Sequence, residues 1–196
     1  VLFRSLVLGM HRSGTSMLAG LLASTGIYAG EEDDFPPTDG HNPQGYWERR
    51  DVWAVDESIL RVLGAQWDDP RDCDLAALPH DARVLLVERA GQGVNALDIR
   101  GPWIVKDPRL CTLLPFWLPM LSRPIAVLLY RDPFAVAHSL ATRDGMPLAR
   151  GLALWERYNR AALAASEGMP RLVIAHRNLL EDPSGTLRGL LAQLPL

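Results

Sequence analysis

The sequence contains only two cysteines, carries little net charge and lacks a long apolar run. Cys73 and Cys111 lie far apart and in no metal-binding spacing, so we expect two free thiols in a reducing compartment, the cytoplasm. A net charge of −3 argues against a general nucleic-acid surface, and any anion-binding site must therefore be local. No apolar run approaches the ~20 residues that cross a bilayer, and no signal peptide is visible. These absences favour a cytoplasmic protein without a transmembrane segment.

The apolar content is sufficient for one folded domain. The chain has 196 residues, of which 48% are hydrophobic and 22% are charged. This length and composition suit a single α/β domain with a sizeable core, and we assign it to residues 1–196. The start at Val1 rather than Met, and the end at Leu196 inside an apolar pattern, favour a domain excised from a longer protein or one that lacks its C-terminal end.

Short apolar segments alternate with helical patterns along the chain. We expect buried strands at residues 6–8, 103–105, 125–130 and 172–174. We expect helices from 15 to about 24, from a cap at Asp51 through Leu63, over 83–90, from Asp132 with Pro133 in its first turn, over 147–167 and over 184–194. Residues 27–50 form a long polar loop and 68–82 a turn-rich segment. The alternation predicts a three-layer, P-loop NTPase-like α/β fold, with helices on both faces of a central parallel sheet.

A glycine-rich segment follows the first predicted strand. The spacing Gly9-x4-Gly14 matches the nucleotide-binding P-loop, but Thr15 stands where that loop has its lysine. Such a loop directs backbone N–H groups and the positive end of a helix dipole toward one point, which attracts an anion. With Arg12 in the loop and no lysine after Gly14, the segment is suited to a phosphate-like group and poorly suited to ordinary ATP hydrolysis.

A second cationic group follows the third predicted strand. Arg131 stands where that strand ends and can donate to two phosphate oxygens, while Ser139, eight residues later, can donate to the same anion. A solvated strand-end charge is the alternative interpretation of Arg131. In a parallel sheet ligands bind at the carboxyl ends of the strands, so the strand ends at Gly9, Lys106, Arg131 and His176 are expected to share one edge.

Two separated anion sites call for a ligand with two separated anionic groups. The pair Gly-x-His-Arg-Ser-Gly-Thr-Ser at 9–16 and Arg-Asp-Pro-x5-Ser at 131–139 resembles the sulfotransferases that use 3′-phosphoadenosine-5′-phosphosulfate (PAPS). Further matches are Asn-Pro-x-Gly-Tyr-Trp-Glu at 42–48, Lys-Asp-Pro-Arg at 106–109 and Trp-x2-Tyr-Asn at 155–159. The chain is similar to the bacterial branch of that superfamily, related to the tyrosylprotein and carbohydrate sulfotransferases.

The resemblance implies a donor, a reaction and a set of residues. The 5′-phosphosulfate of PAPS would be held by Arg12, Ser13, Gly14, Thr15 and Ser16. The 3′-phosphate would be held by Arg131 and Ser139. The reaction would be in-line transfer of a sulfuryl group to a hydroxyl or amine, with no metal ion. Arg12 and Lys106 would stabilise the charge on the moving group, although Lys106 could instead be a strand-end charge paired with Asp107.

The resemblance also implies a glutamate base after the first helix, and we assign that role to Glu48. Glu31 and His41 lie in the same loop and remain alternatives, as does a purely structural Glu48 near a helix start. His11 lies inside the phosphate loop and is a poor base for an acceptor, and His138 is expected on a helix surface.

The sequence departs from the family pattern in one segment. Many relatives carry Tyr-Glu-Asp-Leu after the late strand, where this chain has His-Arg-Asn-Leu at 176–179. The further C-terminal residues that usually complete the nucleotide pocket are not evident before Leu196. The six tryptophans are expected mainly in the core, with one of them able to stack on adenine.

Two other functions remain open. A P-loop kinase-like phosphotransferase would need a lysine after Gly14 and a strand-end carboxylate for magnesium, which only Asp107 and Asp132 offer by position. A non-catalytic nucleotide-binding remnant is the third possibility. We expect the acceptor to be a carbohydrate or another small or lipid-linked molecule. The sequence contains no pattern that identifies this acceptor or the oligomeric state.

Overall fold

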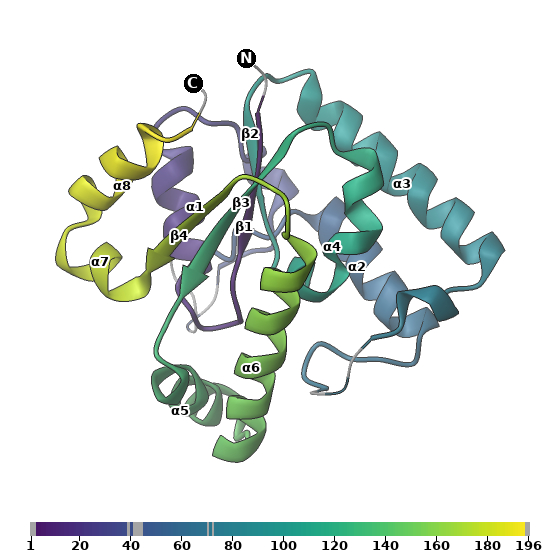
Figure 1. Cartoon of the computed structure of the whole chain (residues 1–196). Helices are drawn as coiled ribbons and strands as arrows, with labels where there is room; N and C mark the ends of the chain where they lie inside the picture. The colour runs from purple at the N-terminus through teal and green to yellow at the C-terminus, as the bar shows by residue number, and fades with distance from the viewer. Residues whose placement is uncertain (1–2, 39, 41–44, 70, 72, 195–196) are drawn as a thin grey trace.

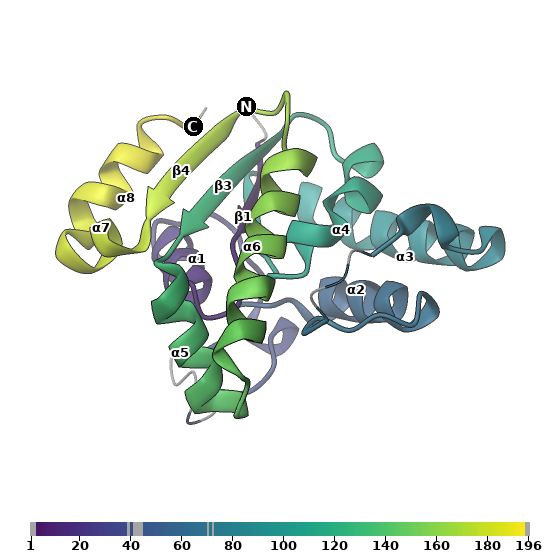
Figure 2. The ribbon, with the colours of Figure 1, turned by 60° about the horizontal axis from the view of Figure 1, so that its bottom comes forward.

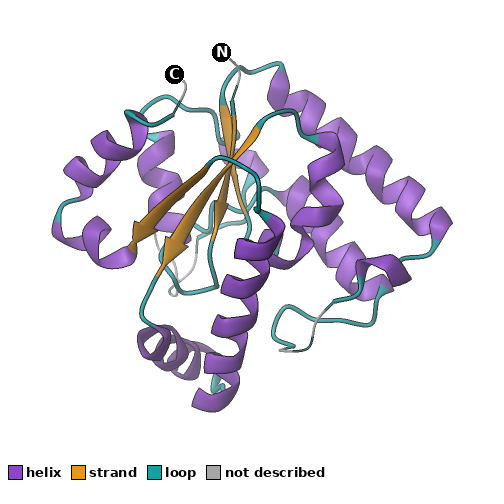
Figure 3. Ribbon diagram, viewed as in Figure 1, coloured by secondary structure: helices purple, strands orange, loops and turns teal. Residues whose placement is uncertain are grey.

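A computed structural model shows a four-stranded sheet in which all strands run parallel (Figure 1; Figure 3). The structure describes residues 3–38, 40, 45–69, 71 and 73–194. The strands are β1 (Arg4–Leu8), β2 (Trp103–Lys106), β3 (Pro124–Tyr130) and β4 (Arg171–Ala175), in the spatial order β2-β1-β3-β4. All four predicted strands are confirmed, with their ends within two residues of the prediction.

The register brings the carboxyl ends of the strands to one edge. Leu6 of β1 pairs with Val105 of β2 and with Ala126 of β3, and Leu128 of β3 pairs with Val173 of β4. Because the strands are parallel, the segments that follow them leave from the same edge of the sheet, as predicted.

Eight α-helices and three short 3₁₀ helices are present in the described part of the chain. The α-helices are α1 (Thr15–Ala23), α2 (Arg50–Val62), α3 (His80–Asp98), α4 (Leu110–Trp117), α5 (Pro133–Asp144), α6 (Leu148–Ala165), α7 (His176–Glu181) and α8 (Pro183–Leu191). The 3₁₀ helices are η1 (Glu32–Asp34), η2 (Leu75–Ala77) and η3 (Leu118–Met120). Asp132 caps α5 as expected, since its side chain accepts a hydrogen bond from the N–H of Ala135 at 2.8 Å.

The helices form layers on the two faces of the sheet (Figure 2). Leu6 and Leu8 of β1 face a core shared with α2, α3, α4, α5 and α6. Val7, between them, faces a second core shared with α1, α7 and α8. Successive strand residues point to opposite faces, so a strand buried on both sides is apolar throughout. The predicted three-layer α/β fold is therefore confirmed.

The structure corrects the prediction that Asp51 caps a helix. α2 has Arg49 at its N-cap and begins at Arg50, so Asp51 lies in the first turn. Its carboxylate accepts hydrogen bonds from the side chain of Arg49 at 3.0 Å and from the N–H of Val52 at 2.8 Å. A carboxylate in the first turn is favoured by the helix dipole without being a cap.

Other helix boundaries also differ from the prediction. α3 begins at His80 and ends at Asp98, so it is longer than the expected 83–90 at both ends and includes part of the expected turn segment. The prediction missed α4 and α7 altogether. α4 contains Pro115 and is buried on most sides, and α7 has six residues and follows β4 directly. No helix in the described ranges is long and apolar enough to span a membrane.

Candidate functional site

The phosphate loop connects β1 to α1 and depends on two glycines. Gly14, at the N-cap of α1, has a φ of +89°, which side chains with a Cβ rarely adopt. A Cβ on Gly14 would lie 2.5 Å from Cδ2 of His176, and one on Gly9 would lie 2.7 Å from the carbonyl oxygen of Leu129. The first-turn N–H groups of α1 have no partner within the helix, so the loop presents donors to an anion.

Contacts from distant elements hold this loop in place. The N–H of Gly9 donates to Sγ of Cys111 at 3.1 Å. The guanidinium of Arg131 donates to the carbonyl oxygen of Arg12 at 2.6 Å, and Nε of Arg12 donates to Oγ of Ser139 at 2.9 Å. Burial raises the pKa of the Cys111 thiol to about 12, so this sulfur stays protonated at neutral pH. Both cysteines are free thiols, as predicted.

Arg131 lies at the end of β3, close to the loop. The indole N–H of Trp155 donates to the Arg131 carbonyl at 2.9 Å, which ties the strand end to α6. Burial and the neighbouring charge of Arg12 lower the pKa of Arg131. Two nearby guanidinium groups repel each other, so an anion between them would be favourable. The phosphate loop and the group formed by Arg131 and Ser139, the two predicted anion-binding sites, therefore lie next to each other, since Arg12 contacts both Arg131 and Ser139.

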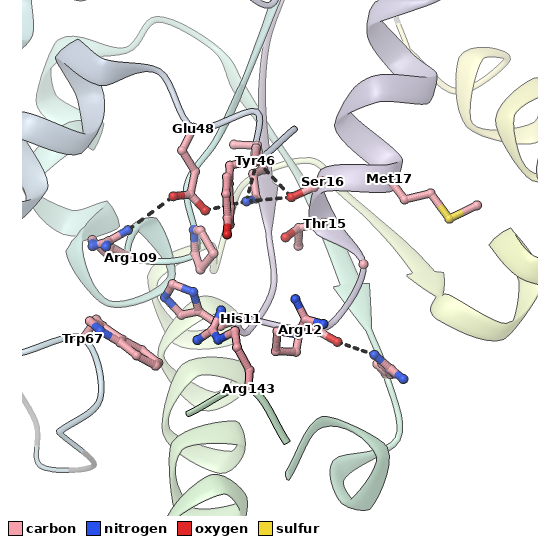
Figure 4. A pocket seen from close by; sticks show the side chains of 14 residues that line it. His11, Arg12, Thr15, Ser16, Met17, Tyr46, Glu48, Trp67, Arg109 and Arg143 are labelled. Atoms are coloured by element: carbon pink, nitrogen blue, oxygen red, sulfur yellow. Dashed lines mark hydrogen bonds and ion pairs between the residues drawn. The ribbon is translucent and has the colours of Figure 1, made fainter. Parts of the chain in front are cut away.

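One pocket of about 360 Å³ contains most of the predicted site residues (Figure 4). Its lining includes Arg12, Gly14, Thr15, Ser16, Glu48, Lys106 and Arg131. Ser13 and Ser139 do not line the pocket. Ser13 is buried in the loop, and its Oγ has no hydrogen-bond partner among the described residues. Ser139 reaches the site through Arg12.

Lys106, the chain's single lysine, lies at the end of β2 with its amino group inside the pocket. Its Nζ donates to Oε1 of Glu48 at 2.6 Å, to the carbonyl oxygen of Tyr46 at 2.9 Å and to Oγ of Ser16 at 3.1 Å. Ser16 also donates to the Tyr46 carbonyl at 2.9 Å. The partner of Lys106 is thus Glu48, and the alternative pairing with Asp107 is absent from the described ion pairs.

Arg109 is a pocket residue to which the sequence analysis assigned no role. Its Nε donates to Glu57 at 2.6 Å, its NH1 donates to Asp107 at 3.0 Å, and it lies 3.8 Å from Glu48. The signal was present in the sequence, because Arg109 belongs to the same Lys-Asp-Pro-Arg motif as Lys106. Lys106 and Arg109 therefore hold Glu48 between two cations (Figure 4).

Two buried carboxyl groups, Asp56 and Asp107, lie behind Arg109. Asp56 accepts a hydrogen bond from the indole of Trp117 at 2.8 Å, and Oδ2 of each aspartate lacks a partner among the described residues. Burial, and then the charge of Asp107, raise the pKa of Asp56 well above its ordinary value. Burial also raises the pKa of Asp107, but Arg109 opposes that shift. We therefore assign the retained proton to Asp56 and the charge to Asp107.

Trp67 and Arg143 form the pocket wall that faces His11 (Figure 4). Arg143 of α5 lies over the Trp67 indole at 5.4 Å. The segment that carries Trp67 is fixed to α6, because the hydroxyl of Tyr158 donates to the Trp67 carbonyl at 2.7 Å and Arg150 pairs with Asp68 at 2.9 Å. Trp67 is the tryptophan whose side chain lines the pocket.

Glu31 and His41, the alternatives to Glu48 as the base, are not among the residues that line the pocket in the described part of the chain. Glu31 does not line the pocket; it pairs with Arg100 at 2.9 Å and belongs to the capping box of η1. His41 lies outside the described residues, as do Asn42 and Pro43 of the motif at 42–48. His138 is exposed on α5, as expected for a surface histidine. Glu48 is therefore the described candidate base that faces the pocket.

The remaining tryptophans have structural surroundings. Trp103 and Trp117 are buried in the core, and Trp53 is exposed. Trp47 packs against Phe35 at 5.4 Å, and Trp155 against Tyr130 at 5.7 Å. The departure at 176–179 is the start of α7, where His176 contacts the phosphate loop at Gly14.

Fold and site together define an α/β protein with a glycine-rich loop at a helix N-terminus and a cation-rich pocket at the carboxyl edge of its sheet. Residues 6–196 match the model of the Sulfotransferase family. The chain therefore belongs to that family, as the sequence motifs predicted, and is a transferase by membership. No curated protein matches the sequence.

Solved sulfotransferase domains have a similar fold at low sequence identity. A "Sulfotransferase Domain from the Synechococcus PCC 7002 Olefin Synthase" is 16% identical with a TM-score of 0.62, and the match covers 97% of this chain and 72% of that one. A "Sulfotransferase Domain from the Curacin Biosynthetic Pathway" is 16% identical with a TM-score of 0.60, covering 100% and 75%. Sulfotransferase STF1 from Mycobacterium tuberculosis H37Rv is 14% identical with a TM-score of 0.54, covering 100% and 68%.

Proposed function

We propose that this protein transfers the sulfuryl group of PAPS to a hydroxyl or amine acceptor. The observation that carries the proposal is the contact of Arg12 with both Ser139 and Arg131, which joins the phosphate loop to a second cationic group. A donor with a phosphosulfate and a separate phosphate supplies anions to both groups. The two free thiols fit our further proposal of a cytoplasmic location.

Five of the seven residues proposed to hold the donor line the pocket, and Ser13 and Ser139 adjoin them in the loop and behind Arg12. The loop residues Arg12, Ser13 and Gly14, together with Thr15 and Ser16 in the first turn of α1, would hold the 5′-phosphosulfate. Arg131 and Ser139 would hold the 3′-phosphate. The close approach at Gly9 and Gly14 leaves no space for larger residues in the loop, so backbone donors can come near the ligand.

The chemistry that follows is an in-line displacement at sulfur. The acceptor oxygen or nitrogen forms a bond to sulfur while the bond from sulfur to the bridging phosphate oxygen breaks, and the electron pair leaves with the bisphosphate. Lys106 and Arg12 would stabilise the charge on the sulfuryl and bridging oxygens. Glu48 would accept the acceptor's proton.

In the structure Lys106 and Glu48 contact each other at 2.6 Å, so neither group is available for these roles without a change of partner. A donor whose bridging oxygen approaches Lys106 would compete with Glu48 for that ammonium group. Glu48 would then be released to face the acceptor.

Thermal unfolding tests the donor class. We would compare 3′-phosphoadenosine-5′-phosphate (PAP), the product of PAPS transfer, with ATP plus magnesium. A ligand at about 100 times its dissociation constant stabilises by about 2.7 kcal/mol, which corresponds to roughly 5–10 °C for a chain of this size. We expect this shift with PAP and none with ATP plus magnesium.

The other outcomes contradict the proposal. A shift with ATP and magnesium alone would favour a phosphotransferase, although Thr15 occupies the lysine position and Asp107 is paired with Arg109. No shift with either ligand would reject PAPS as the donor. Binding of PAP without turnover of PAPS, tested with alcohol and amine acceptors, would indicate a non-catalytic nucleotide-binding domain.

A further inference from the structure

His11 lies in the phosphate loop but has none of the roles proposed above. Its side chain lines the pocket, and the residue is only 9% exposed. Nε2 of its ring is buried and has no hydrogen-bond partner among the described residues. Buried polar atoms in folded proteins are almost always paired, so a molecule that enters the pocket is the natural source of a partner.

Aromatic neighbours fix the orientation of this ring. The His11 ring lies 4.5 Å from the Trp67 ring and 5.8 Å from the Tyr158 ring, measured between centroids. Tyr158 in turn donates its hydroxyl proton to the Trp67 carbonyl at 2.7 Å. The unpaired nitrogen therefore has no protein group to turn toward among the described residues. Because Nε2 is covered in this structure, an acceptor in the pocket reaches it only when a neighbouring side chain of the wall, Trp67 or Arg143, moves aside.

His11 lies at the end of the pocket that is away from Arg131, the proposed 3′-phosphate contact. Figure 4 shows His11 between Arg12 and Trp67, with Arg109 and Glu48 on the same side of the loop. The proposed 3′-phosphate contact, Arg131, is reached from the other side of Arg12, through the Arg12 carbonyl. In-line transfer requires the acceptor to approach opposite the departing bisphosphate and within reach of the base, Glu48.

We propose that His11 and Trp67 form the acceptor subsite, in which Nε2 of His11 hydrogen-bonds the hydroxyl group of a neutral acceptor and the Trp67 indole covers an apolar face of that molecule. This inference rests on the proposed sulfuryl transfer and narrows its acceptor from hydroxyl or amine to hydroxyl.

The charges around His11 distinguish these two acceptor types. Burial, followed by the charges of Arg109 and Lys106, and then those of Arg143 and Arg12, lowers the pKa of His11 well below its ordinary value. The ring is therefore neutral at pH 7 and has one nitrogen able to accept a hydrogen bond. The cations come from β2, from the residue before α4, from α5 and from the loop itself, and Tyr158 of α6 is uncharged at this pH. An alkylammonium group would meet like charge on several sides.

Ligand-detected NMR titration of the PAP-loaded protein tests the assignment with benzyl alcohol and benzylamine as matched probes. We expect benzyl alcohol to bind wild type about tenfold more tightly than benzylamine does at pH 7. In His11→Phe, which keeps a flat ring against Trp67, benzyl alcohol should lose roughly 2- to 12-fold in affinity, the range for one neutral hydrogen bond. His80→Phe, at the exposed start of α3, is the matched control and should bind as wild type does.

A second variant and a direct readout cover the case in which His11→Phe does not fold. His11→Gln keeps a polar side-chain amide and should retain part of the affinity. In wild type, the ¹⁵N resonance of His11 Nε2 should shift when benzyl alcohol is added. Equal alcohol affinity in wild type and His11→Phe, equal binding of amine and alcohol, or no alcohol binding to wild type would each overturn the inference.

The two proposals fail in different ways. PAP is titrated first, and absence of PAP binding rejects the donor assignment. The alcohol titrations are repeated without PAP, so the role of His11 is judged independently. PAP binding combined with insensitivity to His11→Phe rejects only the acceptor subsite.

Discussion

Asp56 is a fully buried carboxyl group with one hydrogen-bond donor, the Trp117 indole, and one unpaired oxygen. An unsatisfied buried polar group costs about 1–3 kcal/mol. Asn at this position keeps the oxygen that faces Trp117 and removes the ionisable proton. The asparagine NH2 lacks a partner as well, so that cost remains, but the folded protein no longer has to take up a proton at this site. We expect Asp56→Asn to raise the free energy of unfolding at pH 7 by about 1.4 kcal/mol for each unit by which folding raises the pKa of Asp56, measured by chemical denaturation.

The pH dependence of this gain has a defined sign. Because the pKa of Asp56 is higher in the folded state than in the unfolded chain, the folded state binds more protons, and its stability falls as pH rises from the unfolded pKa through the folded one. The stability advantage of Asp56→Asn should therefore vanish in acid and grow toward neutral pH.

Asp107→Asn is the contrasting variant. It removes the charge that pairs with Arg109 and should lower the free energy of unfolding by about 3–5 kcal/mol. Destabilisation by Asp56→Asn would show that its carboxylate is charged and needed.

Substitution of Arg131 tests whether this residue recognises the 3′-phosphate that PAP has and adenosine 5′-phosphate lacks. We expect Arg131→Ala to weaken the binding of PAP by about 1.5–3 kcal/mol, the value of a charge-assisted hydrogen bond. Adenosine 5′-phosphate, which lacks the 3′-phosphate, should lose much less. Calorimetric titration of both ligands measures the difference, and equal losses would remove the 3′-phosphate from Arg131.

Glu48 allows a test that separates binding from transfer. In Glu48→Gln the contact with Lys106 weakens, so the ammonium group stays available to the donor and PAP should bind at least as well as in wild type. Transfer should be lost, because an amide cannot accept the proton. Glu31→Gln is the companion variant and should keep transfer, since Glu31 does not line the pocket. Transfer that survives in Glu48→Gln and disappears in Glu31→Gln would move the base to Glu31.

The sequence predicts the residues whose role depends on local pattern. Arg12, Lys106 and Arg131 follow strands or lie in a glycine-rich turn, and parallel topology alone brings such positions to one edge. His11 and Trp67 meet only because α6 holds the segment around Trp67 against the loop, through the hydrogen bond from Tyr158 to the Trp67 carbonyl. No pattern within one segment encodes such a contact.

At the scale of elements, the β1–α1 turn has the strictest sequence requirement. Gly14→Ala combines a φ of +89° with a Cβ placed 2.5 Å from His176, so the turn must distort. We expect a loss of about 1–3 kcal/mol in stability and the loss of PAP binding, measured by denaturation and calorimetry. Gly26→Ala, also at positive φ but with no atom within 4 Å of its Cβ, is the control, and it should cost stability while keeping PAP binding. Full PAP affinity in Gly14→Ala would contradict the assigned role of this turn.

The elements that were predicted correctly share a simple pattern. The strands are short apolar runs buried on both faces, and α5 has an aspartate cap followed by proline. α4 is missed because burial on most sides leaves no polar face and Pro115 interrupts it. α3 is underestimated because Val84 and Leu85 are exposed, so apolar residues do not mark its buried face.

At the scale of the whole molecule, positive charge is concentrated in a chain whose net charge is −3. Five cationic side chains and one carboxylate line the pocket: Arg12, Lys106, Arg109, Arg131, Arg143 and Glu48. We expect PAP affinity to fall severalfold when the NaCl concentration rises from about 0.05 to 0.5 M, because salt screens charges near the surface. Double-stranded DNA should not bind measurably under either condition. Salt-independent PAP binding would place the bisphosphate away from these cations.

Lys106 is the only lysine side chain on which an amine-specific reagent can act in this sequence. Since no other lysine exists in the chain, reagents that acylate or methylate primary amines have one side chain to modify besides the amino terminus. That side chain is 3% exposed and lies where the donor's sulfuryl group is proposed to bind. Its three N–H groups are all engaged in this structure, so the extent of its reductive methylation with ¹³C-formaldehyde would report, without any mutation, when donor, product or acceptor releases the amino group from these partners.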